Sequence, residues 1–193
     1  MKLKRLGQTN MYVTSVGLGC MGFSHAYGVA EDKQKAIETI QKAYDLGYNF
    51  FDTAECYTGI NVDGSINYNE EIVGEALKDV RDKVVIATKF GVVHKGDHLE
   101  FDSSPETIRR SIEGSLKKLQ TDYIDLYYQH RIDPQVEPEV VAGVMKELIE
   151  EGKIKAWGIS EVNEDYLRRA HAVCPVTAIQ NRQYEMTRRK QKK

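Results

Sequence analysis

Short apolar segments alternate along the chain with longer segments in which apolar residues recur at helical spacing. The apolar segments predict six strands, at 15–19, 49–52, 84–89, 123–129, 154–160 and 176–180. Five amphipathic helices are expected between them. This regular alternation is typical of a parallel sheet whose crossover connections are right-handed.

Several helices carry recognisable start and stop signals. Ser104 followed by Pro105 provides a capping hydroxyl and a proline at the first helical position. Asn69 and Asn163 are expected to cap two further helices, and Gly152 is placed to end the helix before the fifth strand. The start and stop signals therefore agree with the hydrophobic periodicity.

Polar residues stand repeatedly at the carboxyl ends of the predicted strands. In a (β/α)8 TIM barrel this rim carries the chemistry, so a barrel is favoured over an open doubly wound sheet. The glycines at 17–22 match the spacing of a dinucleotide-binding loop, but no helix is expected to begin there. We therefore expect one α/β domain, residues 1–193, with about six of the eight βα units of a barrel.

The composition narrows the function classes without choosing among them. The chain is 41% hydrophobic and 29% charged, with a net charge of −2, and five of its last six residues are basic. A mildly acidic body does not suggest a nucleic-acid partner. No apolar run is long enough to cross a bilayer and no secretory signal is apparent, which predicts a cytoplasmic protein. The three separated cysteines indicate reduced thiols rather than a metal site.

Four residues at three consecutive strand ends are the candidate catalytic group. They are Asp52, Tyr57, Lys89 and His130. Each has an ordinary structural explanation alone, but the ends of neighbouring strands would bring all four together. An ammonium beside a tyrosine lowers the pKa of the phenol, a carboxylate would fix the lysine, and a histidine could orient a carbonyl oxygen. Since no side chain supplies hydride, a nicotinamide cofactor is implied.

Two other interpretations remain open at this point. Lys89 could form a Schiff base in a barrel lyase or aldolase, with Asp52 and Tyr57 around it. Alternatively, the chain could be a non-catalytic or inactive protein that keeps the fold as an assembly or accessory subunit. Borohydride trapping would test the first, and a cofactor titration would test the second.

Several motifs occur together in a fixed order, at 6–9 (LGQT), 17–22 (GLGCMG), 51–57 (FDTAECY), 87–89 (ATK), 127–130 (YYQH) and 152–160 (GKIKAWGIS). In this combination the chain resembles the aldo-keto reductases. The resemblance implies NADP(H)-dependent reduction of small aldehydes or ketones to alcohols, with Asp52, Tyr57, Lys89 and His130 as catalytic tetrad and Tyr57 as proton donor.

The resemblance also implies a set of residues that bind the cofactor. Ser160 and Gln180 would hold the nicotinamide carboxamide, Tyr184 would stack on the ring, and Gly22 and Asp52 would also belong to this site. The chain departs from the family pattern in having Glu161 after the serine, where asparagine is usual. The tyrosine follows Gln180 by four residues rather than three.

The family's barrel continues through a seventh and an eighth strand, which the sequence does not contain, so the chain is expected to be truncated. Weak NADPH binding is therefore expected, together with open edges at the first and sixth strands. Pairing with a second copy or with a complementary fragment would cover these edges. The natural substrate is not readable, although the segments 58–68 and 92–103 are expected to be loops beside its pocket.

Overall fold

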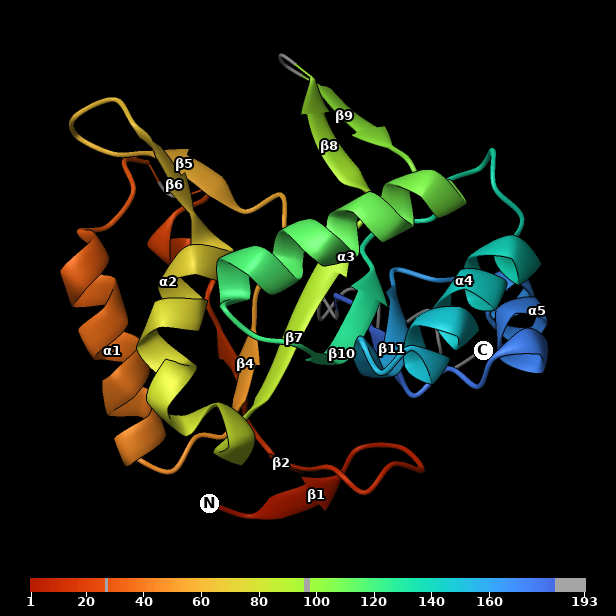
Figure 1. Ribbon diagram of the computed structural model, residues 1–193, viewed down its shortest axis with the longest axis horizontal. Coiled ribbons are helices and arrows are strands. Elements are labelled where there is room, and N and C mark those ends of the chain that lie inside the picture. The colour runs from red at the N-terminus through yellow and green to blue at the C-terminus, as the bar shows by residue number, and fades with distance from the viewer. Residues whose placement is uncertain (27, 96–97, 183–193) are drawn as a thin grey trace, which may run out of the picture.

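The computed structural model describes residues 1–26, 28–95 and 98–182. Its central sheet has six parallel strands whose order in space follows their order in the chain. The strands are β3 (Leu18–Gly19), β4 (Phe50–Asp52), β7 (Val85–Phe90), β10 (Ile124–Gln129), β11 (Ile154–Ser160) and β12 (Ala178–Gln180). All six correspond to predicted strands, although the first and the last are shorter than expected. The sheet curls as part of an incomplete (β/α)8 barrel (Figure 1).

Five α-helices connect these strands and cover the outer side of the sheet (Figure 1). They are α1 (Lys33–Asp45), α2 (Asn69–Leu77), α3 (Pro105–Leu119), α4 (Pro138–Glu150) and α5 (Glu164–Val173). Two 3-10 helices, η1 (Met21–Phe23) and η2 (Lys78–Lys83), complete the helical elements of the described residues. The first of these follows β3 directly, where no helix was expected, but the α-helix of this unit begins only at Lys33.

The helix caps agree with the sequence at two of three positions. Ser104 accepts a hydrogen bond from the backbone of the first turn of α3, and Asn163 does the same for α5. The predicted cap at Asn69 is wrong, because Asn69 is the first residue of α2 and Tyr68 precedes the helix without a side-chain cap. The Asn69 amide is instead drawn into the interior, where it donates to the Cys20 carbonyl oxygen at 2.8 Å.

The main hydrophobic core lies between the sheet and the helices. Trp157 and Phe51 are fully buried in it, and every residue of β7 and β10 is buried. This is the pattern of strands that are covered on both faces. The inner side of the sheet carries a smaller apolar cluster, against which Leu6 and Met11 pack.

Leu6 and Met11 belong to the turn of an amino-terminal hairpin, formed by β1 (Leu3–Arg5) and β2 (Tyr12–Thr14). This hairpin crosses the end of the sheet at which the strands begin (Figure 1). The loop of the hairpin therefore covers the inner apolar cluster at the end where the strands begin. The end formed by the carboxyl ends of the strands is not covered by this hairpin.

The two segments expected as loops contain antiparallel hairpins. Strands β5 (Thr58–Ile60) and β6 (Ile66–Tyr68) pair with each other, as do β8 (Val92–Lys95) and β9 (His98–Phe101). Both hairpins stand beyond the carboxyl ends of the sheet strands (Figure 1). Pairing supplies hydrogen bonds to backbone groups that an open excursion of this length would leave to water.

The outermost strands of the sheet are β3 and β12. Near them, Val16 is 59% exposed and Ile179 is 50% exposed, so the apolar edges expected from the sequence are accessible to solvent. Association with a second chain stays a prediction. Among the described residues, no helix has both the length and the apolar character needed to span a membrane.

Candidate active site

A buried ion pair joins the ends of the neighbouring strands β4 and β7. Lys89 Nζ lies 2.5 Å from Asp52 Oδ1 and donates a second hydrogen bond, of 2.7 Å, to the Thr53 carbonyl oxygen. Lys89 is completely buried, whereas the Asp52 side chain is 19% exposed. Since an uncompensated ammonium would be very costly at this depth, the carboxylate is necessary for the lysine to remain there.

Tyr57 lies in the turn that follows β4, and its hydroxyl is 3.5 Å from Lys89 Nζ. The same ammonium lies 5.0 Å from the centre of the Tyr57 ring. Burial raises the pKa of Tyr57 above its ordinary value, and the positive charge of Lys89 acts in the opposite direction. The expectation that the lysine would lower the tyrosine pKa was therefore right about the direction of this contribution and wrong about the net shift.

His130 directly follows β10, and its backbone N–H donates to the Phe90 carbonyl oxygen at 3.0 Å. Its ring meets Tyr57 edge to face, with ring centres 5.7 Å apart and planes at 83°. Burial lowers the pKa of His130 to about 3, and the charges of Lys89 and Arg131 add to this effect. The imidazole is therefore neutral near neutral pH and carries one N–H.

Ser160 and Gln180 stand side by side at the ends of β11 and β12, where they are paired in register. The Gln180 side-chain amide donates to Asp52 Oδ2 at 3.0 Å, and Ser160 Oγ accepts a hydrogen bond of 3.1 Å from Arg131. Gly22 lies in η1, directly after β3. The structure thus brings the four predicted catalytic residues together, with Gln180 bonded to one of them.

The predicted Tyr184 falls outside the described residues. Its expected stacking role stays a prediction.

A sequence model of the Aldo/keto reductase family matches residues 15–193. This chain belongs to the aldo-keto reductase family. It is 44% identical to Probable aldo-keto reductase 1 from Glycine max over 178 residues, which are 91% of this chain and 49% of that protein.

Solved aldo-keto reductase structures have the same fold. The holo form of aldo-keto reductase AKR11C1 from Bacillus halodurans superimposes with a TM-score of 0.81 at 31% identity, over 95% of this chain and 58% of that one. The glycerol dehydrogenase AKR11B4 from Gluconobacter oxydans gives a TM-score of 0.78 at 30% identity, over 93% and 54% of the two chains. This aldo-keto reductase chain thus spans about half the length of these relatives.

The site of this aldo-keto reductase also contains residues that the sequence did not single out. His25 stacks on Tyr57, with ring centres 5.7 Å apart and planes at 21°, and its Nδ1 lies 2.9 Å from the Thr58 carbonyl oxygen. Cys56 Sγ lies 3.4 Å from His130 Nδ1. Arg131 directly follows His130 and Cys56 directly precedes Tyr57, and this adjacency in the sequence could have identified both as residues of the site. Nothing in the sequence marked His25, because it reaches the site from the segment between β3 and α1.

Glu161, where asparagine is usual in aldo-keto reductases, closes the link between β11 and β12. Its backbone is left-handed, with φ of 53°, and its N–H donates to the Gln180 carbonyl oxygen at 3.0 Å. One carboxylate oxygen accepts a hydrogen bond of 2.7 Å from the Arg182 backbone N–H. Glu161 therefore supports the backbone on both sides of residue 181.

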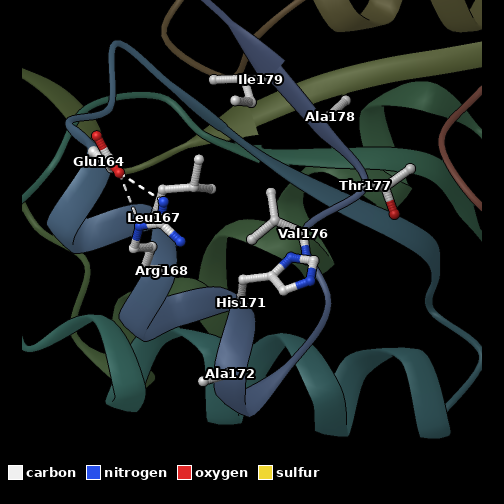
Figure 2. Close-up of a pocket in the computed structure, with 9 residues that line it drawn as sticks. All are labelled: Glu164, Leu167, Arg168, His171, Ala172, Val176, Thr177, Ala178 and Ile179. Carbon is white, nitrogen blue, oxygen red and sulfur yellow. Dashed lines mark hydrogen bonds and ion pairs between the residues drawn. The ribbon is translucent and has the colours of Figure 1, made fainter.

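A pocket of about 560 Å³ lies elsewhere, between α5 and β12 (Figure 2). Its wall is largely apolar, with Leu167, Val176 and Ile179 among the lining residues, and the ion pair of Glu164 with Arg168 lies at its border. None of the tetrad residues lines it. In the part of the chain that the structure describes, no group of three or more histidine, cysteine or acidic residues could hold a metal ion.

Proposed function

We propose that this protein reduces a small aldehyde or ketone to the alcohol, with NADPH as hydride donor and Tyr57 as proton donor. The observation that carries the proposal is the position of Lys89 Nζ, 2.5 Å from Asp52 Oδ1 and 3.5 Å from the Tyr57 hydroxyl. Aldo-keto reductases are oxidoreductases, and the arrangement of these three side chains gives that chemistry a proton source.

Tyr57 is suited to donate its proton when negative charge develops on the carbonyl oxygen of the substrate, and to keep it before that point. Because burial raises the pKa of its phenol, the hydroxyl stays protonated near neutral pH. As negative charge develops on a carbonyl oxygen, the proton moves to that oxygen and a phenolate remains. The Lys89 ammonium lies beside this phenolate and stabilises it, and Asp52 keeps the ammonium in place.

His130 would act as a second hydrogen-bond donor beside Tyr57. A neutral imidazole offers one N–H, and the edge-to-face contact places the His130 ring next to the phenol. A substrate oxygen held by both groups would be oriented toward the proton of Tyr57. His130 thus positions the oxygen, and Tyr57 supplies the proton.

The donor set at Ser160 and Gln180 fits a carboxamide. Ser160 Oγ accepts a hydrogen bond from Arg131, so the hydroxyl proton of Ser160 is directed to another acceptor. The side-chain nitrogen of Gln180 donates to Asp52, which leaves the side-chain oxygen of Gln180 as an acceptor. A primary amide needs one donor and one acceptor of this kind. When bound, NADPH supplies the hydride. The assignment of NADPH rather than NADH rests on the family resemblance.

The two alternative functions are less well supported by this geometry. An ammonium with a carboxylate at 2.5 Å is a poor nucleophile, because Schiff-base formation requires the neutral amine. A non-catalytic accessory subunit would not need a buried ion pair and an imidazole assembled beside one phenol. Neither alternative accounts for the buried ion pair as directly as carbonyl reduction does.

The test is NADPH oxidation in the presence of a panel of small aldehydes and ketones, followed by product analysis. Tyr57→Phe is expected to lower turnover at least about 100-fold, the low end for lost acid catalysis, with cofactor affinity little changed. Tyr123→Phe, which alters a tyrosine outside the tetrad, serves as the matched control. Near-normal reduction by Tyr57→Phe would remove this residue from the mechanism.

A further inference from the structure

Cys56 contacts one of the two ring nitrogens of His130. Its Sγ lies 3.4 Å from His130 Nδ1, within hydrogen-bonding reach of a sulfur atom. Cys56 and His130 come from different strand ends, 74 residues apart in the chain, and each is only 9% exposed. The contact is therefore a buried link between the turn that carries Tyr57 and the residue after β10.

Both partners have a defined protonation state near neutral pH. Burial raises the pKa of Cys56 to about 12, so the thiol keeps its proton. Burial, with the nearby charges of Lys89 and Arg131, lowers the pKa of His130 to about 3, so the ring is neutral. A neutral imidazole has one N–H and one bare nitrogen, and the question is which nitrogen carries the proton.

The chemistry of sulfur favours one of the two tautomers. A thiol can donate its proton to a bare imidazole nitrogen, whereas a thiol sulfur is a weak acceptor for an N–H. A thiol that donates to Nδ1 requires that nitrogen to be bare, which places the ring proton on Nε2. The partner of one ring nitrogen thus sets the state of the other, as is general for functional histidines.

We propose that Cys56 is a positioning residue that holds His130 in the Nε2–H form, so that His130 can donate a hydrogen bond to the carbonyl oxygen of the substrate. The role of His130 as a donor to that oxygen rests on the proposed function. The tautomer itself does not, because it follows from the contact between Cys56 and His130.

The tautomer can be read directly from the protein by NMR. Uniform 15N labelling and long-range proton–nitrogen correlation distinguish Nδ1–H from Nε2–H, and His130→Gln assigns the signal among the five histidines. The wild-type ring is expected to be Nε2–H. In Cys56→Ala the signal should move toward the Nδ1–H form or an exchanging mixture. Cys174→Ala removes another buried cysteine, outside the tetrad, and should leave the His130 signal unchanged.

A serine at position 56 distinguishes the effect of proton donation by the Cys56 side chain from the effect of its volume. Cys56→Ser keeps a donor on the same carbon atom and should restore the Nε2–H form in part or in full. A wild-type ring in the Nδ1–H form, or a tautomer that does not respond to Cys56→Ala, would overturn the proposal. Serine that behaves like alanine would also overturn it, because the thiol would then act by its size alone.

Kinetics on the same variants distinguish this proposal from the proposed function. Cys56→Ala should lower kcat by roughly threefold to tenfold, the range that one hydrogen bond controls, with a smaller change in KM. Cys56→Ser should recover part of that loss, and Cys174→Ala should not change kcat. If the tautomer responds as expected and no variant, nor the wild type, reduces a carbonyl compound, then the proposed function fails and the tautomer assignment stands. An active protein whose kcat is insensitive to Cys56→Ala would refute the positioning role.

Discussion

The Gln180 side-chain amide donates to Asp52 Oδ2 across 3.0 Å, and so links β12, at one edge of the described sheet, to β4. Because Lys89 binds the other carboxylate oxygen at 2.5 Å, both oxygens of Asp52 have a partner. Gln180, which is expected to bind the cofactor carboxamide, therefore shares a carboxylate with Lys89 of the proposed catalytic group. Cofactor binding and the ion pair are predicted to be coupled through Asp52.

Gln180→Ala should consequently weaken two properties at once. Loss of the hydrogen bond to a carboxylate should lower the free energy of unfolding by about 1–2 kcal/mol, and NADPH affinity should fall because the carboxamide loses an acceptor. Urea unfolding and a fluorescence titration with NADPH would measure these changes. Ile179→Ala, at a half-exposed position on the same strand, is the control. An unchanged affinity with reduced stability would separate Gln180 from the cofactor site.

The two members of the ion pair should respond differently to removal. Asp52→Asn leaves the fully buried Lys89 ammonium without a carboxylate, which should cost about 3–5 kcal/mol. Lys89→Met leaves Asp52, which is 19% exposed and still bonded to Gln180, and should cost less. Both variants should lose carbonyl reduction. Chemical denaturation decides the order, and equal destabilisation by the two substitutions would contradict this explanation.

The pH dependence of stability should report the buried His130. Its pKa is about 3 in the folded protein and has the ordinary value of 6.5 when the chain is unfolded, so the unfolded state binds more protons between these values. Stability should therefore fall as pH falls below 6.5. Down to about pH 5, where exposed carboxylates remain ionised, the loss should be about 1–2 kcal/mol, since one pKa unit corresponds to about 1.4 kcal/mol.

His130→Gln removes this contribution, whatever its effect on stability at neutral pH. The free energy of unfolding of the variant should consequently vary less between pH 6.5 and about pH 5 than that of the wild type. Parallel curves for the two proteins would show that His130 is not kept neutral by the fold.

The order and direction of the strands were predictable because a parallel strand that is covered on both faces is a continuous apolar segment of the sequence. Such segments alternate here with amphipathic helical segments. The same logic brought Asp52 and Lys89 together, since the carboxyl ends of neighbouring strands meet at one edge. The β5–β6 hairpin also left a signal, because Asp63-Gly64 is a typical turn pair and Gly64 has φ of +83°.

Other features depend on contacts that no local pattern records. The stacking of His25 on Tyr57 is set by the path of a segment without regular strands or α-helices. The net pKa of Tyr57 depends on the balance between burial and the charge of Lys89, and only a structure gives the extent of burial. The partner of the Asn69 side chain was likewise not predictable from the local sequence. Its amide could cap a helix or, as observed, donate to the Cys20 carbonyl oxygen.

Close packing of α2 against the end of α3 makes Gly74 a sensitive position. A Cβ atom at Gly74 would lie 2.6 Å from the Leu119 carbonyl oxygen and 2.7 Å from two further backbone atoms of the same residue. Backbone atoms cannot move aside as a flexible side chain does, so one helix must shift. Gly74→Ala should therefore lower the free energy of unfolding by about 1–3 kcal/mol, although alanine is the better helix former.

Gly143 provides the matched control for this last prediction. It also lies inside a helix, α4, but a Cβ atom there would meet nothing within 4 Å. Gly143→Ala should therefore be neutral or stabilising by up to about 1 kcal/mol, as expected from helix propensity alone. Urea unfolding followed by circular dichroism compares the two substitutions under identical conditions. If both variants were equally stabilised, the contact between α2 and Leu119 would have enough room for a methyl group, and helix propensity rather than packing would govern position 74.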